Sequence, residues 1–598
     1  DNMVPSITVN GGSVGSPDRL TVNDSADASD NTYNISAMQV TRSDGITNVT
    51  INYSQIENLT LQSGSGDDTV VVASTGATTL VQTAVGEDAI SVLANGHQAT
   101  VQAGADNDAV TVGNGTLDGI GALVSVDGGT QSDSLTIDDA GNANNNTYNI
   151  TPTQVTRAGV TINYTQIENL NLLAGMGHDV VTLFATGAAT LIQGGIGNDT
   201  ISIHATTHFV RAEGNEGNDT FHAGNGTLNN LLVAPTFVGS ETGESLSREI
   251  RQGGAARNGL PYFRPRLEVV STADKLILED GSNGGNARYE IFPSMATRNG
   301  VRRATFSEME VLKLQAGMGN DDVVVRMYQA YRLPDIVQVD GGGGNDNRFQ
   351  VEGTGASDNI SIGDMDSALL GAMFELNQVE RLWARGGAGN DVIDNISRTP
   401  GLMDGGIGDD LLNAIISTPP KQSGGVQTTT ILLGAEGRDK LFAGSGALLD
   451  NRIIGFRDAT GVDAGVPLAA YPDQGIVFVT GDYRLQSPFG NRPLRAVGGG
   501  GTAGDQYASS SAVSKHGVLA LRDNQTNAIR GRFQTIGGDK LRTSSIIGWL
   551  KAELRITKNQ LTKLLGQLNR QVAEYTKSPG AGPSASIRQF TPRNINGK

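Results

Sequence analysis

The chain has 598 residues, too many for one compact hydrophobic core. It contains no cysteine, which excludes disulfides, thiolate metal sites and cysteine nucleophiles. Its formal net charge of -18 argues against a nucleic-acid partner, because nucleic acids are polyanions. With 80 glycines and only 5% aromatic residues, the composition favours thin layers joined by many tight turns.

A longer sequence module opens each of four repeat units. Its first copy runs from Asp18 to Leu61 and its second from Asp133 to Leu172, and looser copies begin at Asp274 and Asp358. The predicted units are 1–132, 133–225, 266–357 and 358–446. Self-similarity of this kind predicts a repeat architecture.

Between the modules, turns rich in glycine and aspartate recur about every 20 residues. The final aspartates of the first three turns are 20 residues apart, and the same trio returns 111 residues later: Asp68, Asp88, Asp108, Asp179, Asp199 and Asp219. Runs of alternating Val, Ile and Leu follow these turns, so each period holds two short strands and two turns. The sequence predicts an all-β fold, a parallel β-solenoid or β-roll with coils of about 20 residues.

The recurring aspartates have two explanations. Glycine adopts positive φ without steric cost, and aspartate accepts hydrogen bonds from backbone N–H groups, so turn formation alone accounts for both residues. Alternatively, stacked coils place like charges about 4.8 Å apart, and Ca²⁺ would neutralise them through oxygen ligands. The candidate calcium ligands are Asp68, Asp88, Asp108, Asp179, Asp199, Asp219, Asp321, Asp346, Asp391 and Asp410.

The segment Gly194–Ser202 resembles the calcium-binding nonapeptide of RTX, or haemolysin-type, proteins, as do Gly386–Ile393 and Gly405–Leu412. The resemblance implies a parallel β-roll, an extracellular location and Ca²⁺ bound at the matching aspartates. RTX arrays repeat every nine residues on both edges, whereas this chain has one motif per 20 residues, so at most one edge is expected to hold metal. The longer module also resembles repeats of large bacterial surface proteins, which are adhesin-like or S-layer-like.

Four other segments depart from the repeats. Residues 226–265 are predicted to form an insertion or joint, 447–543 a mixed β region, 544–577 an amphipathic helix and 578–598 a flexible tail. The helix is expected to cap the solenoid, with docking to a partner or to a membrane surface as alternatives. From residue 484 onward the chain has 18 Lys and Arg against 5 Asp and Glu, so a basic tail follows an acidic body.

The usual catalytic signatures are missing from the sequence, which contains neither H-E-x-x-H nor a phosphate-binding loop. The segment Gly11–Gly15 fits G-x-S-x-G, but it lacks the strand-to-helix setting of a nucleophile elbow. His204 and His208 stand near His222 one coil later, a weak candidate for a metal site. We expect a protein that is not an enzyme, with a solenoid enzyme acting on polysaccharides as the remaining alternative.

The sequence favours an extracellular or cell-surface structural protein that self-associates into a layer, sheath or filament. The alternative is the stalk of a large adhesin, which could contact a cell-surface glycan. No apolar run approaches the roughly 20 residues that span a bilayer, so no membrane insertion is expected.

Overall fold

The computed structural model describes residues 6–12, 15–239, 273–329, 333–364, 373–395, 397, 399, 401–408 and 410–414, and the backbone of short strands between 431 and 508. These residues form β-strands joined by turns, which confirms the all-β solenoid. The chain divides into two units. The first unit comprises Asp1–Leu246, Val270–Ser282 and Val301–Lys313, and the second comprises the rest.

The strands of the first unit form two sheets, and the chain alternates between them. The first sheet contains β1 (Ser6–Asn10), β3 (Thr32–Ser36), β4 (Gln39–Ser43), β5 (Asn48–Ser54), β7 (Thr69–Val72), β9 (Ala89–Val92), β11 (Ala109–Gly113), β13 (Ser134–Asp138), β17 (Asn169–Gly175), β19 (Ala189–Ile196), β21 (Val210–Glu216), β23 (Thr236–Val238) and β27 (Val301–Ser307). The second contains β2 (Arg19–Asn23), β6 (Asn58–Gln62), β8 (Thr78–Gln82), β10 (Ala99–Ala105), β12 (Val124–Thr130), β14 (Thr147–Thr151), β15 (Gln154–Arg157), β16 (Val160–Thr165), β18 (Val180–Leu183), β20 (Thr200–Ile203), β22 (Thr220–Ala223) and β24 (Lys275–Glu279).

The second unit has the same two-sheet plan, and β28 (Val311–Gln315) contains the boundary between the units. One of its sheets contains β25 (Arg288–Phe292), β26 (Met295–Arg298), β29 (Asp322–Arg326), β31 (Arg348–Glu352), β34 (Arg381–Ala388), β36 (Gly401–Ile407) and β38 (Ile431–Glu436). The other contains β30 (Ile336–Asp340), β32 (Asn359–Asp364), β33 (Phe374–Asn377), β35 (Val392–Asn395), β37 (Leu411–Ala414), β39 (Lys440–Ala443), β42 (Arg484–Gln486) and β44 (Gln506–Ala508). A separate parallel sheet contains β40 (Ile453–Ile454), β41 (Gly475–Phe478) and β43 (Leu494–Val497).

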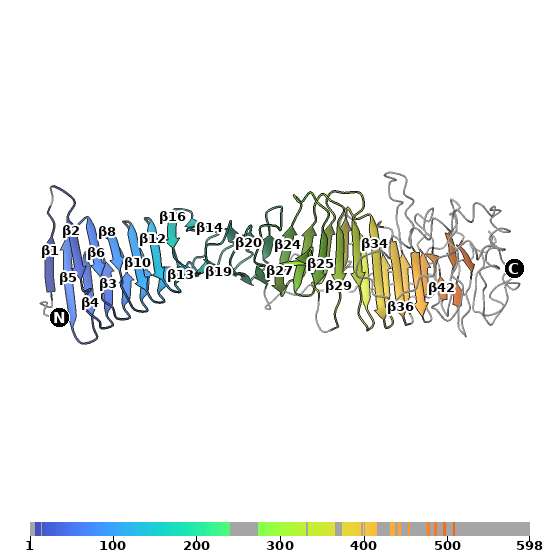
Figure 1. Cartoon of the computed structure of the whole chain (residues 1–598), viewed down its shortest axis with the longest axis horizontal. Helices are drawn as coiled ribbons and strands as arrows, with labels where there is room; N and C mark the ends of the chain where they lie inside the picture. Colours follow the sequence, from blue (N-terminus) through green and yellow to red (C-terminus); the bar gives the residue numbers. More distant parts are fainter. Residues whose placement is uncertain are drawn as a thin grey trace. The chain divides into compact units, whose positions relative to one another are not determined.

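Successive coils stack in register, as the strand arrows of each unit show (Figure 1). Val70 of β7 pairs with Ile90 of β9, which pairs with Val110 of β11, all in parallel. These three side chains are buried, and within each strand the residues on either side of the buried one are more exposed. The apolar alternation therefore builds a narrow core between the two sheets.

The longer modules add an antiparallel strand that the sequence did not predict. β4 pairs antiparallel with both β3 and β5, and β15 does the same with β14 and β16. Only Ala37 and Met38 connect β3 to β4. A two-residue connection can join antiparallel strands but is too short for a parallel crossover, so the chain must reverse here.

Two of the segments that depart from the repeats are described in part, and two lie outside the described residues. β23 lies within the expected insertion 226–265 and pairs in parallel with β21 and β27, so the coil pattern continues to residue 239. The expected mixed β region contains β40 to β44. The predicted helix 544–577 and tail 578–598 lie outside the described residues. Within the described part of the chain, no helix is long and apolar enough to cross a membrane.

Candidate functional site

The turn aspartates form a buried column that we call the inner ladder. The Oδ1 atom of each ladder carboxylate accepts the backbone N–H of the ladder residue in the preceding coil, at 2.6–2.9 Å. In the first unit the two inner ladders comprise Asn31, Asp68, Asp88, Asp108, Asp133 and Glu168, and Asn146, Asp179, Asp199, Asp219, Asp274 and Glu310. Each carboxylate thus ties its coil to the one before it.

The residue before each ladder aspartate forms a second series, the outer ladder, which runs in the opposite sense. The N–H of Asn198 donates to His178 Nδ1 of the preceding coil at 2.7 Å, and the N–H of Asn218 donates to Asn198 Oδ1 at 2.9 Å. The two neighbouring amides of each turn therefore point to opposite coils, and a side chain receives each of them. This arrangement explains why a polar residue precedes the aspartate.

A glutamate of the longer module ends each of three inner ladders, and the same pairing joins Asp18 to Glu57. The Glu57 carboxylate accepts the Asp18 N–H at 2.7 Å, while the Asp18 carbonyl accepts the N–H groups of Glu57 and Asn58. Two residues before each such glutamate, a non-glycine residue has positive φ: Gln55, Gln166, Glu308 and Gln378.

The inner ladders lie on both edges of the solenoid. In each unit the residues of the first ladder directly precede strands of one sheet, and the residues of the second ladder directly precede strands of the other sheet. The ladders therefore alternate between the two edges.

In the second unit, one of the aspartates predicted from the sequence lies outside the inner ladder. Its inner ladders comprise Ala287, Asp321, Asn347 and Glu380, and Asp358, Asp391 and Asp410. Asn347 receives the Asp321 N–H at 2.9 Å, whereas the predicted Asp346 lies outside the ladder and forms ion pairs with Arg348 and Arg381. One additional residue in this turn moves the ladder position by one, and an amide oxygen replaces the carboxylate.

The glycine five residues before many ladder aspartates has a steric cause. A Cβ on Gly194 would overlap the Oδ2 atom of Asp199, and the same holds for Gly386 and Asp391. In the coil before Asp199, Ala174 occupies the equivalent position. Where this residue is glycine, the ladder carboxylate occupies the space that a side chain would need, whereas Thr83 stands at the same position before Asp88 and hydrogen-bonds to its carboxylate.

Burial changes the acidity of the inner ladder. Loss of solvent, together with the charge of neighbouring ladder carboxylates, raises the pKa of Asp199 and that of Asp108 to about 7. Burial likewise raises the pKa of Asp88 and of Asp391 to about 6. Backbone N–H donors oppose these increases without cancelling them.

Backbone donors already occupy one oxygen of each inner-ladder carboxylate. Each Oδ1 already accepts a backbone N–H, and such a donor would point at a bound cation. The carboxylates lie in single file, and the described residues contain no group of three His, Cys, Asp or Glu side chains suited to a metal ion. Calcium binding remains a prediction from the RTX resemblance, whereas the geometry assigns these carboxylates to backbone hydrogen bonding.

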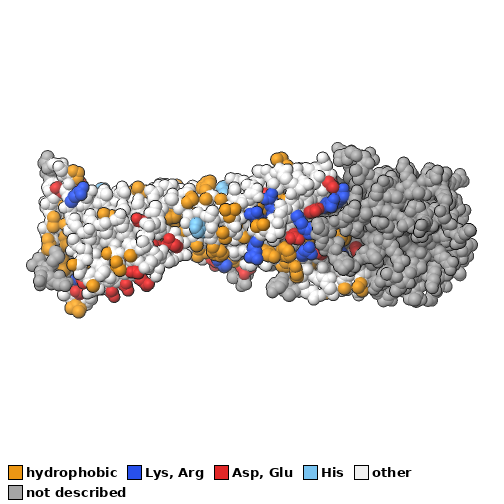
Figure 2. All heavy atoms as spheres, in the orientation of Figure 1, with side chains coloured by type: hydrophobic (Ala, Val, Ile, Leu, Met, Phe, Trp, Pro, Cys, Tyr) orange, Lys and Arg blue, Asp and Glu red, His pale blue; other side chains and the backbone are white. Residues whose placement is uncertain are grey.

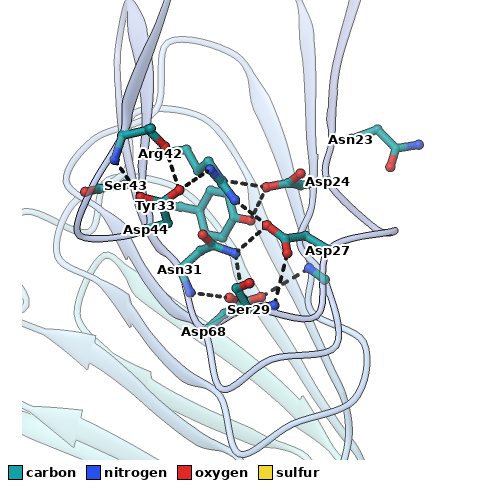
Figure 3. A network of polar contacts seen from close by, with 12 residues as sticks. Asn23, Asp24, Asp27, Ser29, Asn31, Tyr33, Arg42, Ser43, Asp44 and Asp68 are labelled. Carbon is teal, nitrogen blue, oxygen red and sulfur yellow. Dashed lines mark hydrogen bonds and ion pairs between the residues drawn. The ribbon is translucent and has the colours of Figure 1, made fainter. Parts of the chain in front are cut away.

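A second polar cluster joins the hairpin of the first module to the preceding turn (Figure 3). Tyr33 Oη and Arg42 Nε both donate to Asp24 Oδ2, each at 2.8 Å. Arg42, whose side chain is 10% exposed, also forms ion pairs with Asp27 and Asp44. Tyr33 and Arg42 lie opposite each other on β3 and β4, so this ion-pair network fixes the antiparallel hairpin to the solenoid.

The second module repeats this cluster with Asp139, Tyr148 and Arg157. Arg157 Nη1 lies 2.9 Å from Asp139 Oδ2, the Tyr148 hydroxyl donates to the same oxygen, and Asp139 is fully buried. The spacing D-x8-Y-x8-R is common to both clusters and recurs at Asp280, Tyr289 and Arg298, all of them buried. The sequence analysis missed these residues, although the shared spacing could have revealed them.

The three candidate histidines are only partly brought together. His222 Nδ1 lies 2.7 Å from Glu279 Oε1, and His204, whose pKa burial lowers, packs edge-on against Phe184. The His208 ring instead contacts the hydroxyl of Thr207. Ser13 of the G-x-S-x-G match lies outside the described residues.

No family model matches the chain, and no curated protein matches it significantly. The class of protein is therefore defined by the fold alone: a two-sheet β-solenoid with carboxylate ladders along its edges.

Proposed function

We propose that this protein is an extracellular structural protein that self-associates into a surface layer, sheath or filament. The charge distribution carries the proposal. Residues 1–483 hold 26 Lys and Arg against 57 Asp and Glu, whereas residues 484–598 hold 18 against 5. The basic segment of one copy can therefore bind the acidic body of another, and head-to-tail contacts of this kind propagate into filaments.

The solenoid supports this proposal through the placement of its acidic groups. The inner-ladder carboxylates are buried and already hydrogen-bonded to backbone N–H groups. Other acidic side chains gather along one edge of the N-terminal coils, where they face solvent (Figure 2). Such an exposed acidic edge offers a regular series of contacts to a basic partner.

The proposal is tested by sedimentation velocity of the full chain at about 50 mM and about 500 mM NaCl, because salt screens contacts between exposed charges. We expect large assemblies at low salt and smaller species at high salt. Replacing the six Lys and Arg between Lys551 and Lys577 by Gln should abolish assembly. The matched control exchanges Lys for Arg and Arg for Lys at the same six positions, and it should assemble normally.

A monomer at both salt concentrations would refute self-association. Binding of that monomer to a cell-surface glycan would then favour the adhesin stalk.

Calcium is tested separately by hydrogen exchange in EGTA and in millimolar Ca²⁺. Because backbone hydrogen bonds occupy the inner ladder, we expect β7, β9 and β11 to remain equally protected in both. Loss of protection in EGTA would show that the ladder binds metal, and it would restore the role implied by the RTX resemblance.

A further inference from the structure

The first described coil, β1 followed by β2, has the same structure as an internal coil, β12 followed by β13. β1 pairs in parallel with β5 as β12 pairs with β16, and β2 pairs with β6 as β13 pairs with β17. The internal coil has a further neighbour on its other side, where β10 pairs with β12 and β11 pairs with β13. Among the described strands, none pairs with β1 and β2 in the way that β10 and β11 pair with β12 and β13.

The apolar side chains of the first coil are correspondingly less covered. Val9 of β1 and Val22 of β2 point inward but are only half-buried. Their counterparts Val126 and Ile137 are 2% and 0% exposed. Among the described strands the two coils differ in the neighbour on this side, so the first described coil presents an apolar face there.

The inner ladder is incomplete at the same face. Asp18 and Asp133 are equivalent, because the amide of each donates to a module glutamate, Glu57 at 2.7 Å and Glu168 at 2.8 Å. The Asp133 carboxylate accepts the N–H of Asp108 from the preceding coil at 2.8 Å. The Asp18 carboxylate has the position of that acceptor, on the side where a preceding coil would stack.

Backbone groups of β1 also face this side. The Gly11 N–H donates to the Ser54 carbonyl at 3.0 Å, so Gly11 directs its amide toward β5. In a parallel ladder the amide groups of alternate residues face the same neighbour. The N–H and C=O groups of Thr8 and Asn10 therefore face away from β5, as an unpaired strand edge.

We propose that the face formed by β1 and β2 binds a further solenoid coil in parallel register. The partner is a coil like that of β10 and β11: two strands with small apolar side chains facing inward, joined by a turn whose aspartate N–H reaches the Asp18 carboxylate. The internal coil of this chain shows this partner bound to an equivalent face, and it therefore defines the chemistry that the face recognises.

The test uses the full chain and a fluorescent peptide with the sequence of residues 95–113, which spans β10 and β11. We expect saturable binding in fluorescence anisotropy with a Kd on the order of 100 µM, because the unstructured peptide must lose conformational freedom to form a coil. Hydrogen exchange should show new protection in β1 and β2. A peptide of the same composition in scrambled order should not bind.

Two pairs of variants separate docking from folding. Thr8→Pro removes an N–H on the unpaired edge and leaves the pairing with β5 intact, and it should weaken binding at least about ten-fold. Thr8→Val keeps that N–H and should bind within about two-fold of the original chain. Asp18→Ala should weaken binding, whereas Asp18→Asn should retain it, because Asn347 acts as an acceptor in its own ladder.

Several results would overturn the proposal. They are no saturable binding up to about 1 mM peptide, equal binding by the Thr8→Pro chain, or protection outside β1 and β2. Protection of β1 in the full chain without peptide, together with a dimer that Thr8→Pro dissociates, would mean that β1 pairs with β1 of a second copy. That result would also replace the parallel coil as the partner of this face.

Discussion

Replacing Asp199 by asparagine should stabilise the protein at high pH and leave it unchanged at low pH. Asparagine keeps an oxygen that can accept the Asp179 N–H, a bond of 2.7 Å in the structure. It removes the ionisable group, whose pKa burial raises from 3.8 to about 7. Asn347 shows that an amide functions at this ladder position.

The pH dependence follows from the raised pKa. Below pH 3.8 the folded and unfolded chains both hold the proton, so burial of Asp199 carries no ionic penalty. Between pH 3.8 and about 7 the unfolded chain loses a proton that the folded chain keeps, and stability falls as the pH rises. Above pH 7 the loss levels off at roughly 4 kcal/mol as an upper estimate. We therefore expect Asp199→Asn to gain about 2–4 kcal/mol at pH 8 and less than about 0.5 kcal/mol at pH 4.

The assay is the urea concentration at which β18 and β20 lose hydrogen-exchange protection in the full chain. A local probe is needed because a chain of many coils does not unfold in one two-state step. Asp67→Asn is the matched control: Asp67 is exposed and accepts the Glu87 N–H in the outer ladder, so its replacement should change little at either pH. Equal destabilisation by Asp199→Asn at both pH values would refute the reasoning, because it would mean that the charged carboxylate, or an ion bound to it, stabilises the coil.

Two further substitutions test the other structural roles. Arg157→Met should cost about 3–5 kcal/mol, because it leaves the buried Asp139 carboxylate without its cation, whereas Arg211→Met on the exposed surface should cost less than about 1 kcal/mol. Both effects are measured by the local hydrogen-exchange assay in urea, with strands next to each substituted residue as the probe, and equal effects would contradict the proposed role of the cluster. Gly214→Ala should cost about 1–3 kcal/mol, because its Cβ would overlap a ladder carboxylate, whereas Ala174→Gly should cost at most about 1 kcal/mol. A Gly214→Ala chain as stable as the original would show that the ladder side chain can move aside.

The local sequence was sufficient to predict that the turn aspartates form a column. Asp88 and Asp108 stand 20 residues apart, each before an alternating apolar run, and a 20-residue coil places them in one column. The sequence predicted backbone N–H groups as one possible partner of these carboxylates, but it did not reveal that the N–H groups come from the preceding coil, because backbone groups leave no trace in residue identity. The motif also did not show that Asn347 takes the ladder position in place of Asp346, because one additional residue in the turn shifts that position.

The polar clusters at the two hairpins could not be predicted from the periodicity of the sequence. Asp139, Tyr148 and Arg157 are nine residues apart, a separation that matches neither the strand period nor the coil period. They meet because β15 folds back on β14, which brings Arg157 opposite Tyr148 and beside the turn that carries Asp139. Side-chain contacts of this kind depend on the path of the chain between the residues.

The sequence by itself determined the repeat length, the strands and the narrow apolar core, because these follow from local spacing: glycine turns at a fixed interval and alternating Val, Ile and Leu between them. Only the tertiary structure decided the direction of the added strand, the alternation of the ladders between two edges, and the partial exposure of the apolar side chains of β1 and β2. Each of these depends on which coil lies next to which, and stacking between coils is set by backbone hydrogen bonds that all residues can form.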